Sequence, residues 1–256
     1  GINTGPVSID IMQTMKRKDK IVSDMHMGLD FLMKKNKISV YEGLGSFIDK
    51  NTVKVEGKEK KEIKTKNIII ATGSKPGSLP FIQIDKERII TSTEALSLKE
   101  IPRKLIIIGG GVIGLELGQV YSRLGSEVSV IEYADRILPI MDSSLSRELT
   151  KVMKKQKIKF YLSHEVKKVD RQKEKVIVNA SDLKGNEIVF EGDYCLVSVG
   201  RKPYIEGLNP EKADIKVNDK GQIEVNEKLQ TSTKNIYAIG DVVRGAMLAH
   251  KAEEEG

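Results

Sequence analysis

The sequence predicts an α/β fold built on a parallel sheet, and two observations in one stretch of chain support this. Residues 105–108 form a wholly apolar run, which is typical of a parallel strand buried on both faces. A glycine-rich turn, a helix over 112–124 and a second strand over 128–131 follow it. Strands that alternate with helices in this way form a parallel sheet with right-handed crossover connections.

Hydrophobic periodicity predicts the remaining elements. Ser8 is expected to cap a first helix, whose apolar residues recur at helical spacing from Ile11 to Leu32 and which Asn36 is expected to end. Asp142 is expected to cap a later helix that continues through Met153. Strands are predicted at 38–41, 47–48, 52–55, 67–70, 158–162, 165–169, 175–179, 187–190, 194–199, 223–225 and 236–239, with a hairpin turn at 185–186.

Length and composition indicate an ordinary globular protein. The 256 residues suit roughly two domains, and 39% apolar with 31% charged residues excludes a disordered chain. The longest uncharged apolar stretch, 105–115, contains four glycines and is shorter than the ~18 residues of a membrane span, so no membrane segment is predicted. The single cysteine, Cys195, excludes an internal disulfide and a cysteine-rich zinc site, and we predict a buried, unreactive thiol and no metal site.

The net charge of +7 lies mostly in residues 1–66. The lysines there alternate with acids, as in residues 58–62, and neither interleaved aromatic residues nor an arginine cluster accompanies them. Such a basic excess without a stacking platform is typical of a solvated surface, and we predict no nucleic-acid partner. A scaffold or nucleic-acid role for this region is the weakest alternative.

The glycine-rich turn predicts a dinucleotide site. Gly109, Gly111 and Gly114 satisfy the G-x-G-x-x-G pattern, which follows an apolar strand and opens a helix. Gly109 permits a tight turn, Gly111 lets the main chain approach a pyrophosphate, and Gly114 lets the helix pack closely on the strand. The helix start then offers unpaired N–H groups and partial positive charge to the phosphates. The alternative is a glycine-rich turn without a ligand.

Glu132 favours NAD(H) over NADP(H). It ends the second strand, 18 positions after Gly114, close to the spacing of ~20 expected for the acid of this motif. A carboxylate there can accept hydrogen bonds from the adenosine ribose hydroxyls and would repel a 2′-phosphate. Arg136 is the one nearby cation, and we interpret it as a surface residue.

Four segments occur in an order that resembles the flavin-dependent pyridine nucleotide–disulfide oxidoreductases. They are residues 71–74, 109–114, 198–203 and 236–241, and the run 240–256 resembles the branch of that family that oxidises dihydrolipoyl groups. The resemblance implies two Rossmann-like nucleotide-binding units, the FAD/NAD(P)-binding fold. It implies an NAD-binding domain over 98–205, inserted in an incomplete FAD-binding domain made of 1–97 and 206–256.

The resemblance also implies contacts for both cofactors, FAD and NAD. For NAD they are Gly109, Gly110, Gly111, Val112, Ile113, Gly114, Leu115, Glu116, Glu132, Val166 and Gly200. For FAD they are Gly43, Thr72, Gly73, Ser74, Asp241, Met247, Leu248, Ala249 and His250. Asp241 would bind the ribityl chain, unless it only caps the segment after it. His26 and His164 match no functional position.

The family's first glycine motif and its redox cysteine pair lie upstream of the matched region, and its catalytic His–Glu pair lies downstream. Because the chain starts at Gly1 without Met and ends in helix formers at 249–256, we expect an internal piece that has no catalytic residue and is inactive alone.

The whole protein is expected to be an enzyme that passes electrons from dihydrolipoyl groups through a disulfide and FAD to NAD+. An NADH oxidase, another disulfide reductase of the family, or a non-catalytic NAD-binding fragment are the alternatives. The resemblance implies a homodimer, lipoyl domains of 2-oxo-acid dehydrogenase complexes as partners, and a location in bacterial cytoplasm or the mitochondrial matrix.

Overall fold

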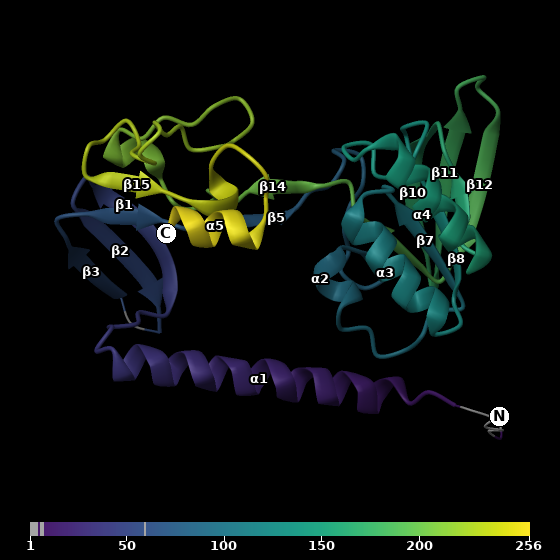
Figure 1. Ribbon diagram of the computed structural model, residues 1–256, viewed down its shortest axis with the longest axis horizontal. Helices are drawn as coiled ribbons and strands as arrows, with labels where there is room; N and C mark the ends of the chain where they lie inside the picture. Colours follow the sequence, from purple (N-terminus) through teal and green to yellow (C-terminus); the bar gives the residue numbers. More distant parts are fainter. Residues whose placement is uncertain (1–4, 6–7, 59) are drawn as a thin grey trace. The chain divides into compact units, whose positions relative to one another are not determined.

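The computed structural model describes residues 5, 8–58 and 60–256 and separates into two compact units (Figure 1). The first unit comprises residues 1–26 and 76–200, and the second comprises 27–75 and 201–256. The chain therefore leaves the second unit after Lys75 and returns to it at Arg201.

A five-stranded parallel sheet forms the centre of the first unit. Its order is β6 (Ile89–Ile90), β13 (Tyr194–Val197), β7 (Lys104–Ile108), β8 (Glu127–Ile131) and β9 (Lys159–Tyr161). Helix α3 (Val112–Arg123) connects β7 to β8, and α4 (Ser143–Lys155) connects β8 to β9. The predicted α/β fold with a parallel sheet is confirmed. A short helix, α2 (Ser92–Ala95), carries a capping box formed by Thr91 and Glu94.

An antiparallel sheet lies against the parallel one. It contains β10 (His164–Gln172), β11 (Lys175–Asp182) and β12 (Glu187–Gly192), and the predicted hairpin turn joins the last two. Gly185 in that turn has φ +83°, a left-handed conformation that glycine adopts at low cost. The Asp182 carboxylate accepts hydrogen bonds from the backbone N–H groups of Lys184 and Asn186.

Alternate residues of β7 belong to two different cores. Leu105 and Ile107 pack with Leu115 of α3, whereas Ile106 and Ile108 pack with residues of the antiparallel sheet. Side chains of a strand alternate between its two faces, so this strand is covered on both sides. That double burial explains its continuous apolar run.

The second unit is built from short elements around one core. Strands β1 (Gly43–Asp49), β2 (Thr52–Gly57) and β3 (Lys60–Lys64) form an antiparallel sheet. Strand β4 (Ile68–Ile70) pairs in parallel with β15 (Ile236–Ala238), and β5 (Ser74–Pro76) pairs with β14 (Arg201–Pro203). The remaining elements are the 3-10 turns η1 (Pro210–Ala213) and η2 (Gly240–Val242) and the helix α5 (Ala249–Glu255).

Helix α1 (Ile11–Lys35) begins later than predicted. The Asp10 side chain accepts a hydrogen bond from the Gln13 N–H at 2.9 Å, so Asp10, and not Ser8, caps the helix. A cap must stand directly before the first turn, and Ser8 lies two residues too early. The predicted end before Asn36 is confirmed. No residue of α1 is buried.

Two strand predictions are wrong, and four strands were not predicted: β3 and the short strands β5, β6 and β14. Residues 38–41 form no strand, since no described segment pairs with their backbone, and their apolar side chains are exposed. Residues 223–225 make only an isolated bridge from Ile223 to Val217. Strand β3 escaped prediction because lysine and glutamate dominate it. Its pairing with β2 overrides that low strand propensity.

Cys195 is completely buried in β13, as predicted, and burial raises the pKa of its thiol. Among the described residues, no helix has the length and apolar character needed to cross a membrane. The same part of the chain contains no cluster of three or more His, Cys, Asp or Glu residues that could hold a metal ion.

The double burial of β7 predicts a large stability effect. Ile107 has no exposed surface, so Ile107→Ala should lower the free energy of unfolding by about 2–5 kcal/mol. Val189 on β12 is 64% exposed, and Val189→Ala should change the free energy of unfolding by less than about 0.5 kcal/mol. Urea unfolding followed by circular dichroism measures both, and equal effects would contradict the assigned core.

Candidate functional site

The glycine turn after β7 begins at Gly109 with a backbone shape that only glycine fits. Gly109 has φ +106°, and a Cβ atom there would lie 2.5 Å from the Ser198 carbonyl oxygen on the neighbouring chain segment. The Gly109 N–H donates a hydrogen bond to the Ile131 carbonyl oxygen at 2.9 Å. The turn is therefore pressed against the segment after β13 and tied to the end of β8.

Gly111 leaves an open space at the start of α3. It is the N-cap residue, with φ −80° and ψ 178°, and no atom lies within 4 Å of the position a Cβ would take. No side chain caps the helix, whose first N–H groups have no partner within it. A helix of 12 residues adds partial positive charge at this end. The arrangement can therefore bind an anion through main-chain N–H groups.

Gly114 is required by packing. A Cβ there would overlap the Ser198 Oγ and the Gly109 carbonyl oxygen. The Ser198 hydroxyl lies 3.1 Å from the Ile108 oxygen and 3.2 Å from the Gly109 oxygen, to which it donates. Ser198 therefore holds the turn from the adjacent strand. Its role was not predicted, because no sequence pattern indicates that β13 lies beside β7.

Glu132 is fixed beside the turn by two backbone donors. Its Oε2 accepts a hydrogen bond from the Gly110 N–H at 2.5 Å, and its Oε1 accepts one from the Ala134 N–H at 2.8 Å. A Cβ on Gly110 would lie 3.1 Å from Oε2, so the carboxylate lies directly on the turn. The predicted motif acid and the glycine turn are thus in contact at the carboxyl ends of β7 and β8.

The other residues predicted to contact NAD differ in exposure. Val112 and Glu116 are exposed on α3, Ile113 is half-buried, and Gly200 is exposed with φ +112°. Leu115 and Val166 have buried side chains in the two cores, so only their backbones are available to a ligand.

Two neighbouring polar residues bond to backbone oxygens two or three residues away in their own segments. Arg136 donates to the Pro139 oxygen at 3.1 Å, as a surface residue would. His164 places Nδ1 2.6 Å from the Leu162 oxygen.

A second constellation lies within the second unit. The Ser74 hydroxyl donates to Asp241 Oδ2 at 2.5 Å, although the two residues are 167 positions apart. Arg201 donates from Nε to Ser74 Oγ and from Nη2 to the Ser74 carbonyl oxygen, both at 2.7 Å. Gly73, with φ +70°, allows the chain to turn before Ser74. Two predicted FAD residues are therefore bonded together, and Arg201, which was not predicted, joins them.

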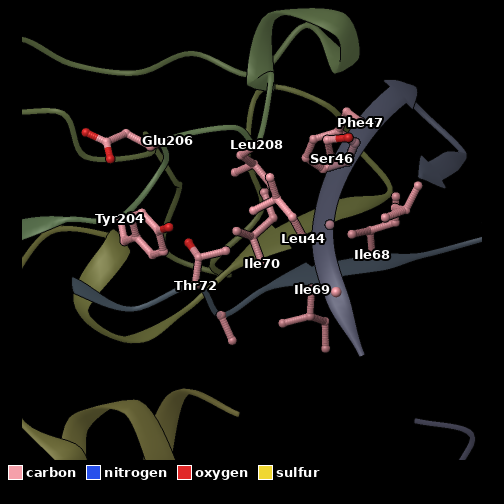
Figure 2. A pocket seen from close by; sticks show the side chains of 14 residues that line it. Leu44, Ser46, Phe47, Ile68, Ile69, Ile70, Thr72, Tyr204, Glu206 and Leu208 are labelled. Atoms are coloured by element: carbon pink, nitrogen blue, oxygen red, sulfur yellow. The ribbon is translucent and has the colours of Figure 1, made fainter. Parts of the chain in front are cut away.

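The second unit also contains a cavity of about 340 Å³ (Figure 2). Residues of β1, β4 and the segment after β14 line it, and its walls are mainly apolar. Gly43 and Thr72, both predicted to contact FAD, lie among its lining residues. A mainly apolar space lined by a few polar groups is typical of a site for a small molecule or cofactor.

The predicted flavin-facing segment ends in α5. Met247 is half-buried, whereas Leu248, Ala249 and His250 are exposed. Burial alone would raise the pKa of Glu255, but hydrogen bonds from Lys251 and from the Gly240 N–H outweigh it and lower this pKa. The Glu255 carboxylate thus remains charged and fixes the residue that precedes Asp241.

Comparison with known proteins identifies the family. Residues 3–256 match the pyridine nucleotide-disulphide oxidoreductase family. The chain belongs to this family. A family member from Pisum sativum named dihydrolipoyl dehydrogenase, mitochondrial, is 43% identical over the whole chain, which covers 52% of that protein. The corresponding protein of Dictyostelium discoideum is 45% identical, with 54% of its length covered, and a leghemoglobin reductase of Glycine max is 42% identical, with 50% covered.

A solved structure agrees with this membership. The HOCl-induced flavoprotein disulfide reductase RclA from Escherichia coli matches 96% of this chain and 56% of its own, with a TM-score of 0.84 and 29% sequence identity. It supports a Rossmann-type fold of the kind that binds FAD and NAD. The chain spans about half the length of the curated relatives it matches.

The close contact at Gly114 predicts a stability difference between two glycines of one turn. Gly114→Ala should lower the free energy of unfolding by about 1–3 kcal/mol, because the new methyl group overlaps Ser198 and Gly109. Gly111→Ala should fold with nearly unchanged stability, since its site is open and its backbone angles suit alanine. Urea unfolding of both variants tests this, and equal losses would contradict the packing.

Proposed function

We propose that the chain forms the nicotinamide-nucleotide side and part of the flavin side of a dihydrolipoyl dehydrogenase. The whole protein would pass electrons from dihydrolipoyl groups through an active-site disulfide and FAD to NAD+. The similarity of the entire chain to relatives with that name supports the reaction. The contact of Glu132 with the turn beside the open Gly111 is the observation that carries the nucleotide site.

The residues present fit a dinucleotide with a free 2′-hydroxyl. The N–H groups at the start of α3 would bind the pyrophosphate, and the empty position at Gly111 lets it approach. Glu132 would accept hydrogen bonds from the ribose hydroxyls and repel a 2′-phosphate. The other proposed NAD contacts are those named from the family resemblance, with Leu115 and Val166 acting through their backbones.

The second unit fits the flavin nucleotide. Gly43 and Thr72 line the cavity and would contact the adenosine half of FAD there. Asp241 would accept a hydrogen bond from a hydroxyl of the ribityl chain. Residues 247–250 would face the flavin ring with their backbone. Bound FAD would supply the two-electron chemistry, while these residues would hold and orient it.

The domain boundaries remain a proposal. We assign residues 98–205 to NAD and residues 1–97 and 206–256 to FAD, in two Rossmann-like units. The compact units divide the chain at 75/76 and 200/201, so Arg201, near the end of the range assigned to NAD, lies in the same unit as the proposed flavin residues. The chain contains one cysteine and so cannot itself form the redox disulfide; by itself it would bind nucleotides without turnover. We also propose a homodimer and lipoyl-domain partners, which the family resemblance supports, and a mitochondrial location, which the names of the relatives support.

Glu132 is expected to set the cofactor preference. The chain should bind NADH more tightly than NADPH. Glu132→Ala should weaken NADH binding about 10-fold, or ~1.4 kcal/mol, and should reduce the ratio of the NADH affinity to the NADPH affinity. Glu132→Gln removes the negative charge but retains a hydrogen-bond acceptor. This variant should therefore bind NADPH more tightly than the unaltered chain does, and it should lose less affinity for NADH than Glu132→Ala. Isothermal calorimetry measures the NADH and NADPH affinities of the unaltered chain and of both variants, six values in all.

The matched control is Glu127→Gln on β8, the strand directly before Glu132. Glu127 is an exposed acid, and its substitution should leave both nucleotide affinities unchanged. Equal or tighter binding of NADPH by the unaltered chain would reject the role of Glu132.

Gly111→Ala is expected to separate folding from binding. Its methyl group should occupy the space proposed for the pyrophosphate, so NADH affinity should fall by at least ~10-fold, corresponding to ~1.4 kcal/mol. The circular dichroism spectrum should stay unchanged. Unaltered NADH affinity in this folded variant would show that the phosphates bind elsewhere.

A further inference from the structure

Arg201 makes two hydrogen bonds to a single residue of the proposed flavin site. Its Nε–H donates to the Ser74 hydroxyl oxygen and its Nη2–H to the Ser74 carbonyl oxygen, each at 2.7 Å. A planar guanidinium offers two such donors in a fixed geometry, which a lysine ammonium cannot reproduce. Arg201 is exposed, so the core of the second unit does not depend on it.

The serine transmits this interaction to Asp241. A hydroxyl has one proton to donate, and its oxygen accepts from other donors. The Arg201 Nε–H donates a hydrogen bond to the Ser74 Oγ. The Ser74 hydroxyl proton therefore points away from Arg201, and it is donated to Asp241 Oδ2 at 2.5 Å. The carboxylate is thereby held by one oxygen, and Oδ1 remains to accept a bond from a ligand.

The backbone around this chain of bonds is fixed at both ends. On one side, the Tyr204 N–H donates to the Gly73 carbonyl oxygen at 2.9 Å, so the segment carrying Arg201 holds two successive residues of the turn. On the other side, Glu255 holds the N–H of Gly240, which has φ +74° directly before Asp241. Such support confines a binding group to one orientation.

We propose that Arg201 is a positioning residue of the flavin site, which acts through Ser74 to orient Asp241 toward a ribityl hydroxyl of FAD. The proposal deepens the proposed function and rests on it. Arg201 follows Gly200 directly in the sequence, and no pattern of charge or spacing distinguishes it from the exposed Lys202. Its role is defined by the two bonds that join it to Ser74 and by the one bond that joins Ser74 to Asp241.

Titration of FAD into the whole chain, followed by quenching of flavin fluorescence, tests the proposal. Arg201→Met should weaken FAD binding about 10-fold, while Arg201→Lys should lose less, because an ammonium can satisfy one of the two acceptors. Lys202→Met, on the same strand, is the control and should bind as the unaltered chain does. The melting temperatures of all three variants should agree, since neither side chain is buried.

A double-mutant cycle distinguishes positioning from direct contact. If Arg201 acts through Ser74, the Arg201→Met/Ser74→Ala variant should bind FAD no more weakly than Ser74→Ala alone. Additive losses would mean that Arg201 contacts FAD independently, and would overturn the proposal. Amide hydrogen exchange without FAD gives a second readout: residues 73–75 should exchange faster in Arg201→Met and not in Lys202→Met.

The outcomes also separate this proposal from the proposed function. FAD binding by the unaltered chain, with equal affinity in Arg201→Met, would reject the role of Arg201 and leave the flavin site standing. Failure of the unaltered chain to bind FAD would reject a flavin site formed by this chain alone, and with it the role of Arg201 in such a site.

Discussion

The hydrogen bond between the Gly110 N–H and the Glu132 carboxylate joins the two parts on which the nucleotide site depends. The glycine turn alone offers donors and an open position, and such turns bind many anions. The acid alone is an ordinary carboxylate at a strand end. Held together by this bond, they place a negative group at a fixed position beside an anion-binding helix start. That combination is what would distinguish one dinucleotide from another.

This arrangement depends in turn on the order of the strands. Because β8 lies beside β7, the residue after β8 reaches the turn after β7. Because β13 lies on the other side of β7, Ser198 and its carbonyl oxygen fill the space next to Gly109 and Gly114. The glycines are thus required for two different reasons. Gly109 and Gly114 accommodate protein atoms, whereas Gly111 leaves a space that no atom of the described residues fills.

The sequence predicted what local chemistry determines. The apolar run 105–108, the helix after it, the cap at Asp142 and the position of Glu132 after β8 all follow from periodicity and capping rules, and the structure contains each of them. Strand β3 and the roles of Ser198 and Arg201 could not be predicted, because they depend on which segments meet in space. The cap at Asp10 was missed for a simpler reason, since two residues able to cap lie close together before α1.

The central claim is that the open position at Gly111, beside Glu132, receives the pyrophosphate of NAD(H). A crystal structure of the chain soaked with NADH tests it most directly. The account predicts the two phosphates over the first turn of α3 and the adenosine ribose within hydrogen-bonding distance of the Glu132 carboxylate. A nucleotide bound elsewhere, or side chains that fill the space at Gly111, would contradict it.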